Sequence, residues 1–453
     1  MKTNQNLYWL SAFVLLIFVL LFTFLIYVQY TATIPIYNFI AFFISISTII
    51  YIIWFVNDPR HAILAAFYFI TISPSIPWPI GIFIPELRII FAILGLIYGL
   101  FLNKVEVRSL SNLYIKLILG FFLLLIAYLF ISKVPTYGRE KIISFLILIV
   151  IPVIIFFIMS PMQEKDLKSL ITICIMVSIF HSLRIIFYGS YNDSRGLSEF
   201  LLSPISYARY AGLGIVILFT LLVSKSLNIL KMSLIYFLLI FLTFALFITG
   251  SRGPIISILF SIIVVLVINF KKKELTFILA IKKLIIFILV LNICIYIMPV
   301  KFNEIQGINR IFSYSYSTNN LNALSSGRSE LIKIAFKGFL DSNFIGIGTG
   351  GFPSLLNRQD ELYPHNIILE VLVEQGLAGF ILISLLFLLT LRRASLIISS
   401  HTFTKSQEII VVLWFYSFMN SMFSCDINGN YTFWIFGAFV WLLPFKKDIN
   451  LSG

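Results

Sequence analysis

Long apolar runs are the feature that most limits how this chain can fold. Runs of about 20 hydrophobic residues, the length that crosses a bilayer as a helix, recur along the 453-residue sequence. Hydrophobic residues make up 60% of the chain and charged residues only 11%, which is too apolar for a soluble domain. The sequence therefore predicts an all-α, polytopic membrane protein, because a helix satisfies its own backbone polar groups in lipid.

These runs predict about 12 to 14 transmembrane helices. The candidate spans are residues 7–28, 36–56, 61–73, 87–102, 113–131, 142–159, 169–188, 204–224, 232–249, 254–270, 284–298, 366–391, 408–424 and 431–444. The first is expected to be retained as a helix, because no small-residue cleavage site follows it. The prolines at 74, 77, 79 and 85 also allow the third span to be kinked or re-entrant.

Basic residues predict the orientation. The net charge of +14 comes from Lys and Arg clusters in alternate short loops, which is the pattern of topology signals and argues against nucleic acid as a partner. Both termini are then cytoplasmic, and the long hydrophilic segment is outside. We expect N-terminal membrane helices over 1–248, further membrane helices over 249–298, one large extracytoplasmic loop over 299–365, and C-terminal membrane helices over 366–453.

A short turn between two apolar runs holds an arginine at the predicted outer interface. It reads T-G-S-R-G over residues 249–253, and an arginine there is costly unless it is paired, so Arg252 is a functional candidate. A guanidinium is always charged, and its planar fork matches phosphate oxygens, as a lipid-linked diphosphate would need. The alternative is that Arg252 snorkels to lipid headgroups.

The long loop contributes two further motifs. The letters S-S-G-R-S-E over 325–330, followed by apolar residues at helical spacing, predict a capped amphipathic helix lying on the membrane, with Arg328 in its first turn. Next comes I-G-I-G-T-G-G over 345–351. No Lys-Ser/Thr pair follows these glycines, so a nucleotide site is not expected. They predict a tight turn that lets the backbone approach a substrate or another helix closely.

The loop ends in a segment that joins polar groups to an apolar helix. Pro364 suits the first turn, so a helix is predicted to begin near His365. Asn366, Glu370 and Glu374 recur every fourth residue and share one face. His365 would lie where both water and a polar substrate reach it, which favours chemistry at a membrane boundary. The alternative is that His365 and Asn366 only cap the helix.

In this order the motifs resemble the O-antigen ligase and polymerase family of bacterial envelope proteins. The resemblance covers residues 249–379, from T-G-S-R-G through G-R-S-E and I-G-I-G-T-G-G-F to P-H-N-I-I-L-E-V-L-V-E-Q-G-L-A-G. The spacing from His365 to Gly376 is similar to a repeated polymerase motif. The arginine version of that motif is not cleanly present, because nine residues separate Arg328 from Gly338.

The resemblance implies a GT-C-like helical fold and a metal-independent glycosyltransferase that needs no cofactor. Its substrates would be undecaprenyl-diphosphate-linked sugars at the outer, periplasmic face of the bacterial cytoplasmic membrane. Arg252 and Arg328 would bind the diphosphate, and His365 would be the general base; these are the roles that guanidinium and neutral imidazole chemistry also allow. Four more residues are predicted to contact substrate: Arg195, Arg209, Asn366 and Glu370. Neither the outer carboxylates nor the widely spaced cysteines have metal-site spacing.

Within the family, a polymerase is favoured. It would join oligosaccharide repeat units of an O-antigen, capsule or exopolysaccharide, and a chain-length regulator is a possible partner. The chain has more predicted spans than a minimal ligase, and Arg195 and Arg209 could hold a second diphosphate-linked substrate. The alternatives are a ligase, which moves finished polymer to lipid A core or protein, and a flippase or exporter of lipid-linked sugars. A flippase would favour charge pairs buried mid-span and halves related by a repeat, and neither is evident.

Overall fold

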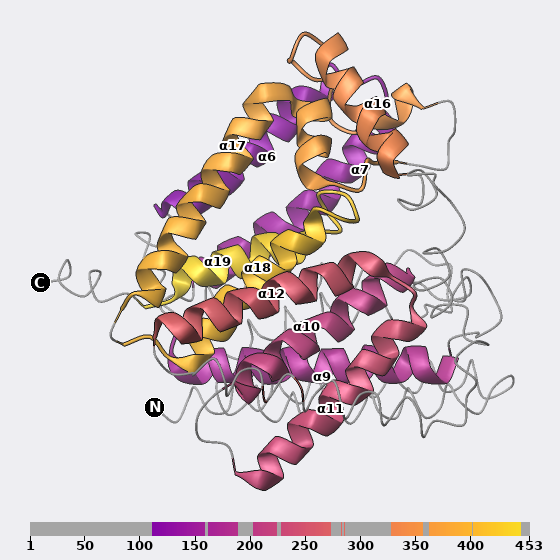
Figure 1. Ribbon diagram of the computed structural model, residues 1–453. Helices are drawn as coiled ribbons and strands as arrows, with labels where there is room; N and C mark the ends of the chain where they lie inside the picture. The colour runs from indigo at the N-terminus through magenta and orange to yellow at the C-terminus, as the bar shows by residue number, and fades with distance from the viewer. Residues whose placement is uncertain are drawn as a thin grey trace, which may run out of the picture. The chain divides into compact units, whose positions relative to one another are not determined.

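The computed structural model describes residues 111–158, 162–188, 203–223, 228–272, 282, 285, 328–356, 362–400 and 402–444. All of them belong to one compact unit, Glu106–Gly453. Within these ranges every regular element is helical (Figure 1). The predicted spans 7–28, 36–56, 61–73 and 87–102, the span 284–298 except for residue 285, and the candidate Arg195 fall outside the described residues.

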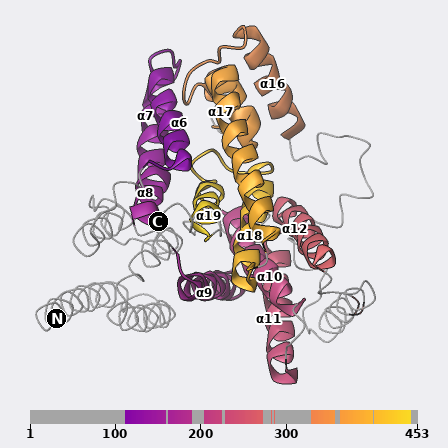
Figure 2. The same ribbon diagram turned by 90° about the vertical axis from the view of Figure 1, so that its left-hand side faces the viewer.

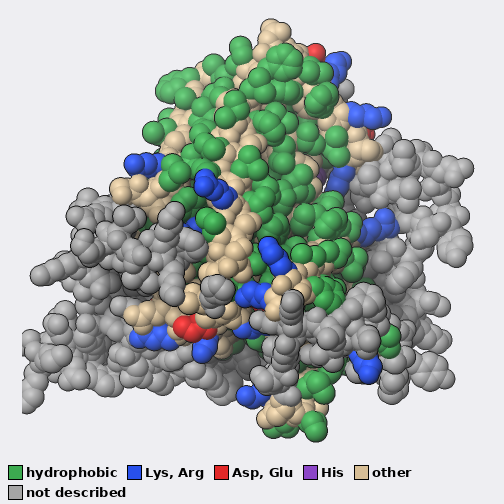
Figure 3. Space-filling model, turned by 60° about the vertical axis from the view of Figure 1, so that its left-hand side comes forward, with side chains coloured by type: hydrophobic (Ala, Val, Ile, Leu, Met, Phe, Trp, Pro, Cys, Tyr) green, Lys and Arg blue, Asp and Glu red, His purple; other side chains and the backbone are tan. Residues whose placement is uncertain are grey.

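Six described helices are long and apolar enough to cross a membrane: Pro135–Ile158, Glu164–Leu183, Pro204–Leu222, Ile229–Ile248, Arg252–Lys271 and Ile367–Ile398. Two shorter apolar helices are α6 (Leu113–Leu129) and α19 (Tyr431–Leu442). The chain is therefore a polytopic helical membrane protein, as the apolar runs predicted. In the view of Figure 3, hydrophobic side chains cover most of the described surface, and Lys and Arg form small groups among them.

The helix starting at Pro135 has three parts: α7 (Pro135–Phe145), a π-helical segment (Leu146–Val150) and α8 (Ile151–Ile158). Pro152 follows the π segment and cannot donate a backbone hydrogen bond, which is a common cause of a local change in helix winding. The helix starts at 135, before the predicted span 142–159, because proline suits a first helical turn. Lys141 therefore lies within a helix, just before the start of the predicted span.

The middle of the chain forms α9 (Glu164–Tyr188), α10 (Pro204–Leu222), α11 (Ile229–Ile248) and α12 (Arg252–Lys271). Helix α10 packs on α9, α11 and α12, and α18 (Lys405–Ser421) packs on α10, α12 and α19 (Figure 2). Trp414 of α18 and Trp434 of α19 are fully buried. The ring of Trp434 lies 5.5 Å from Phe121 and 5.4 Å from Phe145, so α19 is joined to α6 and α7 by aromatic packing.

Two further helices, α16 (Arg328–Asp341) and α17 (Ile367–Ile398), pack on each other. Both begin where the sequence predicted a helix. Helix α17 is interrupted at Gly376, whose backbone is non-helical with φ 61° and ψ −153°. Glycine adopts this conformation without a Cβ clash, and the break frees backbone groups on either side of it.

Helix ends that the predicted topology places on the cytoplasmic side lie together. Glu164, at the start of α9, accepts hydrogen bonds from the hydroxyls of Thr404 (2.8 Å) and Ser406 (2.6 Å) near the start of α18. Asn269, near the end of α12, donates to Glu408 of α18 at 2.6 Å. This grouping fits the alternation of the described spans, because these three ends are predicted on one face.

Candidate active site

Residues 345–351, which follow α16 and which we call the glycine segment, pack tightly against two helices. Gly346, Gly348 and Gly350 all have positive φ, between 72° and 95°. A Cβ on Gly346 would lie 2.6 Å from the carbonyl oxygen of Glu374, and one on Gly350 would lie 2.6 Å from the backbone nitrogen of Gly138. Side chains are excluded at such distances. The predicted close approach to another helix is thus confirmed, on both α17 and α7.

The break in α17 and the glycine segment satisfy each other's backbone groups. The amides of Ile347 and Gly348 donate to the carbonyls of Val373 (2.9 Å) and Glu374 (3.0 Å), and the amide of Leu377 donates to Phe344 (3.0 Å). The break at Gly376 takes the Val373 and Glu374 carbonyls out of the helical hydrogen-bond pattern, and the glycine segment supplies their donors. The segment and the first part of α17 therefore form one rigid piece.

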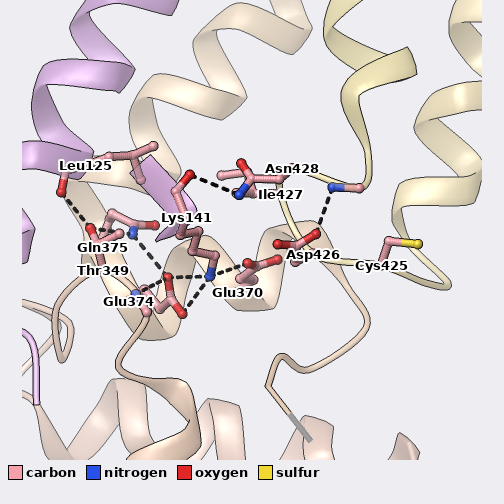
Figure 4. A network of polar contacts seen from close by, with 12 residues as sticks. Leu125, Lys141, Thr349, Glu370, Glu374, Gln375, Cys425, Asp426, Ile427 and Asn428 are labelled. Carbon is pink, nitrogen blue, oxygen red and sulfur yellow. Dashed lines mark hydrogen bonds and ion pairs between the residues drawn. The ribbon is translucent and has the colours of Figure 1, made fainter. Parts of the chain in front are cut away.

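A buried cation joins α17 and the glycine segment to α7. The Lys141 ammonium lies 2.5 Å from a carboxylate oxygen of Glu370 and 2.8 Å from Glu374, and the three side chains are at most 1% exposed (Figure 4). Glu374 also accepts the Gly350 amide at 2.9 Å. A lysine buried without counter-charges would be strongly disfavoured, so the two carboxylates are what allow Lys141 to lie here. Glu370 and Glu374 share a face, as predicted.

The loop between α18 and α19, residues 422–430, lies beside this cation and is held by an arginine of α10. The Arg209 guanidinium donates to the carbonyls of Asn420 (2.9 Å), Ser424 (2.8 Å) and Gly429 (3.2 Å). Asn428, within the loop, donates to the Lys141 carbonyl at 3.0 Å. We name residues 422–430 the outer loop. Its backbone is fixed from both sides, by α10 and by α7.

The outer loop carries one carboxylate that is half-buried. Asp426 accepts the Gly429 amide at 2.7 Å, and its carboxylate lies next to that of Glu370 in the close view (Figure 4). Within the described ranges, no three His, Cys, Asp or Glu side chains are grouped so that they could hold a metal ion.

His365 lies in the turn just before α17. Its φ is 57°, the left-handed region, and its ring is 4.7 Å from that of Tyr363 in an edge-on arrangement. Both side chains are partly exposed. Burial raises the pKa of the Tyr363 phenol above its ordinary value; Cys425, Asp426 and Glu370 raise this pKa further, and Arg209 opposes them. Tyr363 and His365 thus lie against each other in the turn before α17.

Asn366 is the N-cap of α17. Its side-chain oxygen accepts the amides of Ile368 (3.0 Å) and Leu369 (3.1 Å), so the capping alternative is confirmed for this residue. Its amide nitrogen donates to the Met422 carbonyl at 3.1 Å, which fixes the turn containing His365 to the outer loop.

Arg252 is the first residue of α12, and its neighbour Gly253 packs on the same loop. Gly253 packs so closely on Phe423 that a Cβ there would lie 3.0 Å from the Phe423 Cβ. Met422, the neighbour of Phe423, is the residue that Asn366 contacts. The turns that carry Arg252 and His365 are therefore brought to adjacent residues of the outer loop, although the two residues are 113 positions apart in sequence.

Arg328 is carried by a different element from these residues. It is the first residue of α16 and is half-buried. Helix α16 packs on α17 and the glycine segment through Leu331, Ala335, Ile347 and Val373. The structure thus gathers Arg209, Arg252, His365, Asn366 and Glu370 around the outer loop.

Sequence reasoning missed Lys141 and Asp426. Two buried carboxylates at positions 370 and 374 require a cation, but Lys133, Arg139 and Lys141 are all candidates near the predicted outer ends. Only the pairing of α7 with α17 selects Lys141. Asp426 stands in a short loop with no motif around it, so the sequence carries no signal for it.

Residues 237–384 match the model of a family described as O-antigen ligase. The match runs from α11 through α12 and α16 into α17. It contains the turns that carry Arg252 and His365, whereas Lys141, Arg209 and the outer loop lie outside it. No curated protein matches the chain.

Proposed function

We propose that this chain is a glycosyltransferase for lipid-diphosphate-linked glycans, with its site at the outer loop, because residues 237–384 match the model of a family described as O-antigen ligase. The observation that carries the proposal is that the turns bearing Arg252 and His365 meet adjacent residues of that loop, through Gly253 and Asn366. A guanidinium and a partly exposed imidazole are the groups that such a transfer needs, one for the leaving group and one for the attacking hydroxyl.

In the proposed reaction, a hydroxyl oxygen of the acceptor sugar attacks the anomeric carbon of the donor. The bond from that carbon to the diphosphate oxygen breaks, and the diphosphate leaves with the electron pair. His365 takes the proton of the attacking hydroxyl. Arg252, with Arg328 as a second guanidinium, offsets the negative charge that grows on the diphosphate. No metal ion or cofactor is part of this proposal.

The other predicted contacts take more specific roles. The Nη atoms of Arg209 donate to protein acceptors of the outer loop, so we assign Arg209 to holding this loop in place. Glu370 is fully buried beside Lys141, and Asn366 caps α17. We therefore propose that Glu370 and Asn366 act on the substrate by positioning the turn of His365. Asp426 is the remaining half-buried carboxylate of the outer loop and is open to an acceptor hydroxyl.

As the specific activity we propose polymerisation of undecaprenyl-diphosphate-linked repeat units at the outer face of the bacterial cytoplasmic membrane. It is supported by the number of predicted spans. A ligase is the second candidate, because the matched family is described as O-antigen ligase. The flippase alternative gains nothing from the buried charges, since Lys141, Glu370 and Glu374 lie near the N-terminal ends of their helices and not mid-span.

Deletion of the gene distinguishes these activities. The surface polysaccharide is separated on a gel, and the lipid-linked pool is extracted in parallel. A polymerase deletion leaves a single repeat unit on the lipid A core and no ladder. Polymer stranded on the lipid carrier instead identifies a ligase, and full-length polymer at wild-type levels contradicts both activities.

A further inference from the structure

Helix α16 presents three different sides. Its buried side consists of Leu331, Ala335, Gly338 and Phe339, which face α17 and the glycine segment. A water-soluble loop helix that buries one side in this way exposes polar residues on the rest of its surface. Helix α16 does so only in part, because a second apolar side remains exposed.

This exposed side is large and continuous. Ile332, Phe336 and Leu340 follow each other at every fourth residue and are 42%, 51% and 43% exposed. Phe344 and Ile345, directly after the helix, are 48% and 58% exposed. We call these five residues the apolar stripe of α16. Scattered exposed hydrophobic residues are ordinary on any protein, but a contiguous row indicates a contact surface.

The stripe continues onto a membrane helix. The Leu377 amide of α17 donates to the Phe344 carbonyl at 3.0 Å, so the two residues are neighbours. Leu377 and Ile381 of α17 are 46% and 61% exposed, on a helix long and apolar enough to span the bilayer. Side chains exposed on such a helix face lipid. The stripe therefore continues the lipid-facing surface of α17 onto α16.

Charged residues lie along one edge of the stripe. Lys333 and Lys337 each directly follow a stripe residue, and both are exposed, as are Glu330 and Asp341 on the same polar side. Successive helical residues differ by about 100°, so each lysine stands beside the stripe and not on it. Lysine stems commonly cover apolar surface while their ammonium groups reach lipid headgroups.

We propose that the apolar stripe of α16 is embedded in lipid, in the leaflet next to the N-terminal end of α17. This is the outer leaflet in the predicted topology. Lys333 and Lys337 then lie at headgroup level, and the buried side of the helix holds the glycine segment at the same depth. One consequence rests on the proposed function: Arg328, which begins α16, is kept at the height where the diphosphate of a lipid-linked donor lies.

Photo-crosslinking of the full-length protein in lipid vesicles tests the proposal without any assay of turnover. p-Benzoylphenylalanine is placed at position 336 or 337, and adducts are identified by mass spectrometry after illumination. Both side chains are exposed, so folding tolerates both replacements. We expect adducts with lipid acyl chains to be several-fold more abundant at 336 than at 337, although the two positions are neighbours in sequence.

Three outcomes overturn the proposal. Equal lipid adducts at 336 and 337 mean that the stripe has no preferred lipid contact. Adducts between position 336 and residues 1–110 of the same chain mean that the N-terminal segment covers the stripe. Crosslinked dimers mean that a second copy of the protein covers it. The readout is independent of glycosyl transfer, so a failed activity assay and a failed crosslink are distinguishable.

Discussion

His365 is positioned through the backbone as well as through its ring. Its left-handed φ of 57° turns the chain into α17, and Asn366 fixes that turn to Met422. We predict that His365→Ala lowers turnover by roughly 10²- to 10⁴-fold while donor binding changes little, because a general base acts on the chemical step. Turnover and donor binding of the purified protein are measured separately, with EDTA present because no metal is invoked.

His365→Gln separates the base from a structural role. Glutamine keeps hydrogen-bonding capacity and much of the volume, but it cannot accept a proton near neutral pH. It should be as inactive as the alanine variant. Near-normal turnover in His365→Gln would make the imidazole structural and would turn attention to Asp426 as the base.

Arg252 is predicted to need both its positive charge and the planar shape of its guanidinium group for activity. Arg252→Ala should abolish product while the protein still accumulates in the membrane. Arg252→Lys should restore little activity, because an ammonium keeps the charge and loses the bidentate fork. Arg392→Ala, an exposed arginine near the other end of the membrane helices, is the matched control and should keep full activity. Full activity of Arg252→Lys would point to headgroup snorkelling instead.

At the scale of elements, Lys141 joins α7 to α17. Lys141→Met removes the cation and leaves Glu370 and Glu374 buried with no counter-charge, which should cost about 3–5 kcal/mol. We expect a clearly lower midpoint of thermal unfolding in detergent. Lys133→Met changes an exposed lysine in the turn before α7 and should unfold like the wild type. Equal midpoints for the two variants would mean that the buried pair does not hold these helices together.

The glycine segment makes a second prediction at this scale. Gly348 has φ 93°, and a Cβ there would collide with the backbone of Ser132. Gly348→Ala should therefore destabilise the protein by more than the roughly 1–3 kcal/mol of backbone strain alone. Gly120 in α6 has open space where a Cβ would be, so Gly120→Ala should be neutral or slightly stabilising. The yield of monodisperse protein after heating compares the two variants.

The sequence was sufficient to predict the elements and insufficient to predict their partners. Apolar runs located α10 to α12, α18 and α19 within a few residues, because length and hydropathy alone identify a membrane helix. Helix α9 begins earlier than its predicted span 169–188, and α17 continues beyond its predicted span 366–391. The turn at Arg252 and the start of α17 near His365 were also predicted from glycine, proline and arginine. The pairing of Lys141 with Glu370, and the place of the outer loop between Arg252 and His365, depend on contacts between distant segments, which local patterns do not encode.

For the whole molecule, the first prediction concerns orientation. Tags inserted at residues 319–323 should be labelled by an impermeant reagent on intact cells. Tags at residues 271–273, at the end of α12, should be labelled only after the membrane is permeabilised, because the basic cluster there is expected on the cytoplasmic side. The reverse pattern would place the outer loop in the cytoplasm, away from extracytoplasmic substrates.

Reconstitution of the purified protein shows whether it polymerises lipid-linked repeat units. The purified protein is placed in vesicles with one lipid-diphosphate-linked repeat unit as the sole glycan, EDTA is added, and the lipid-linked products are resolved by length. We predict products of two and more repeat units, together with released lipid diphosphate. Arg252→Ala should give no such products. Repeat units that cross the membrane without growing, or polymer transferred only when lipid A core is supplied, would contradict this prediction.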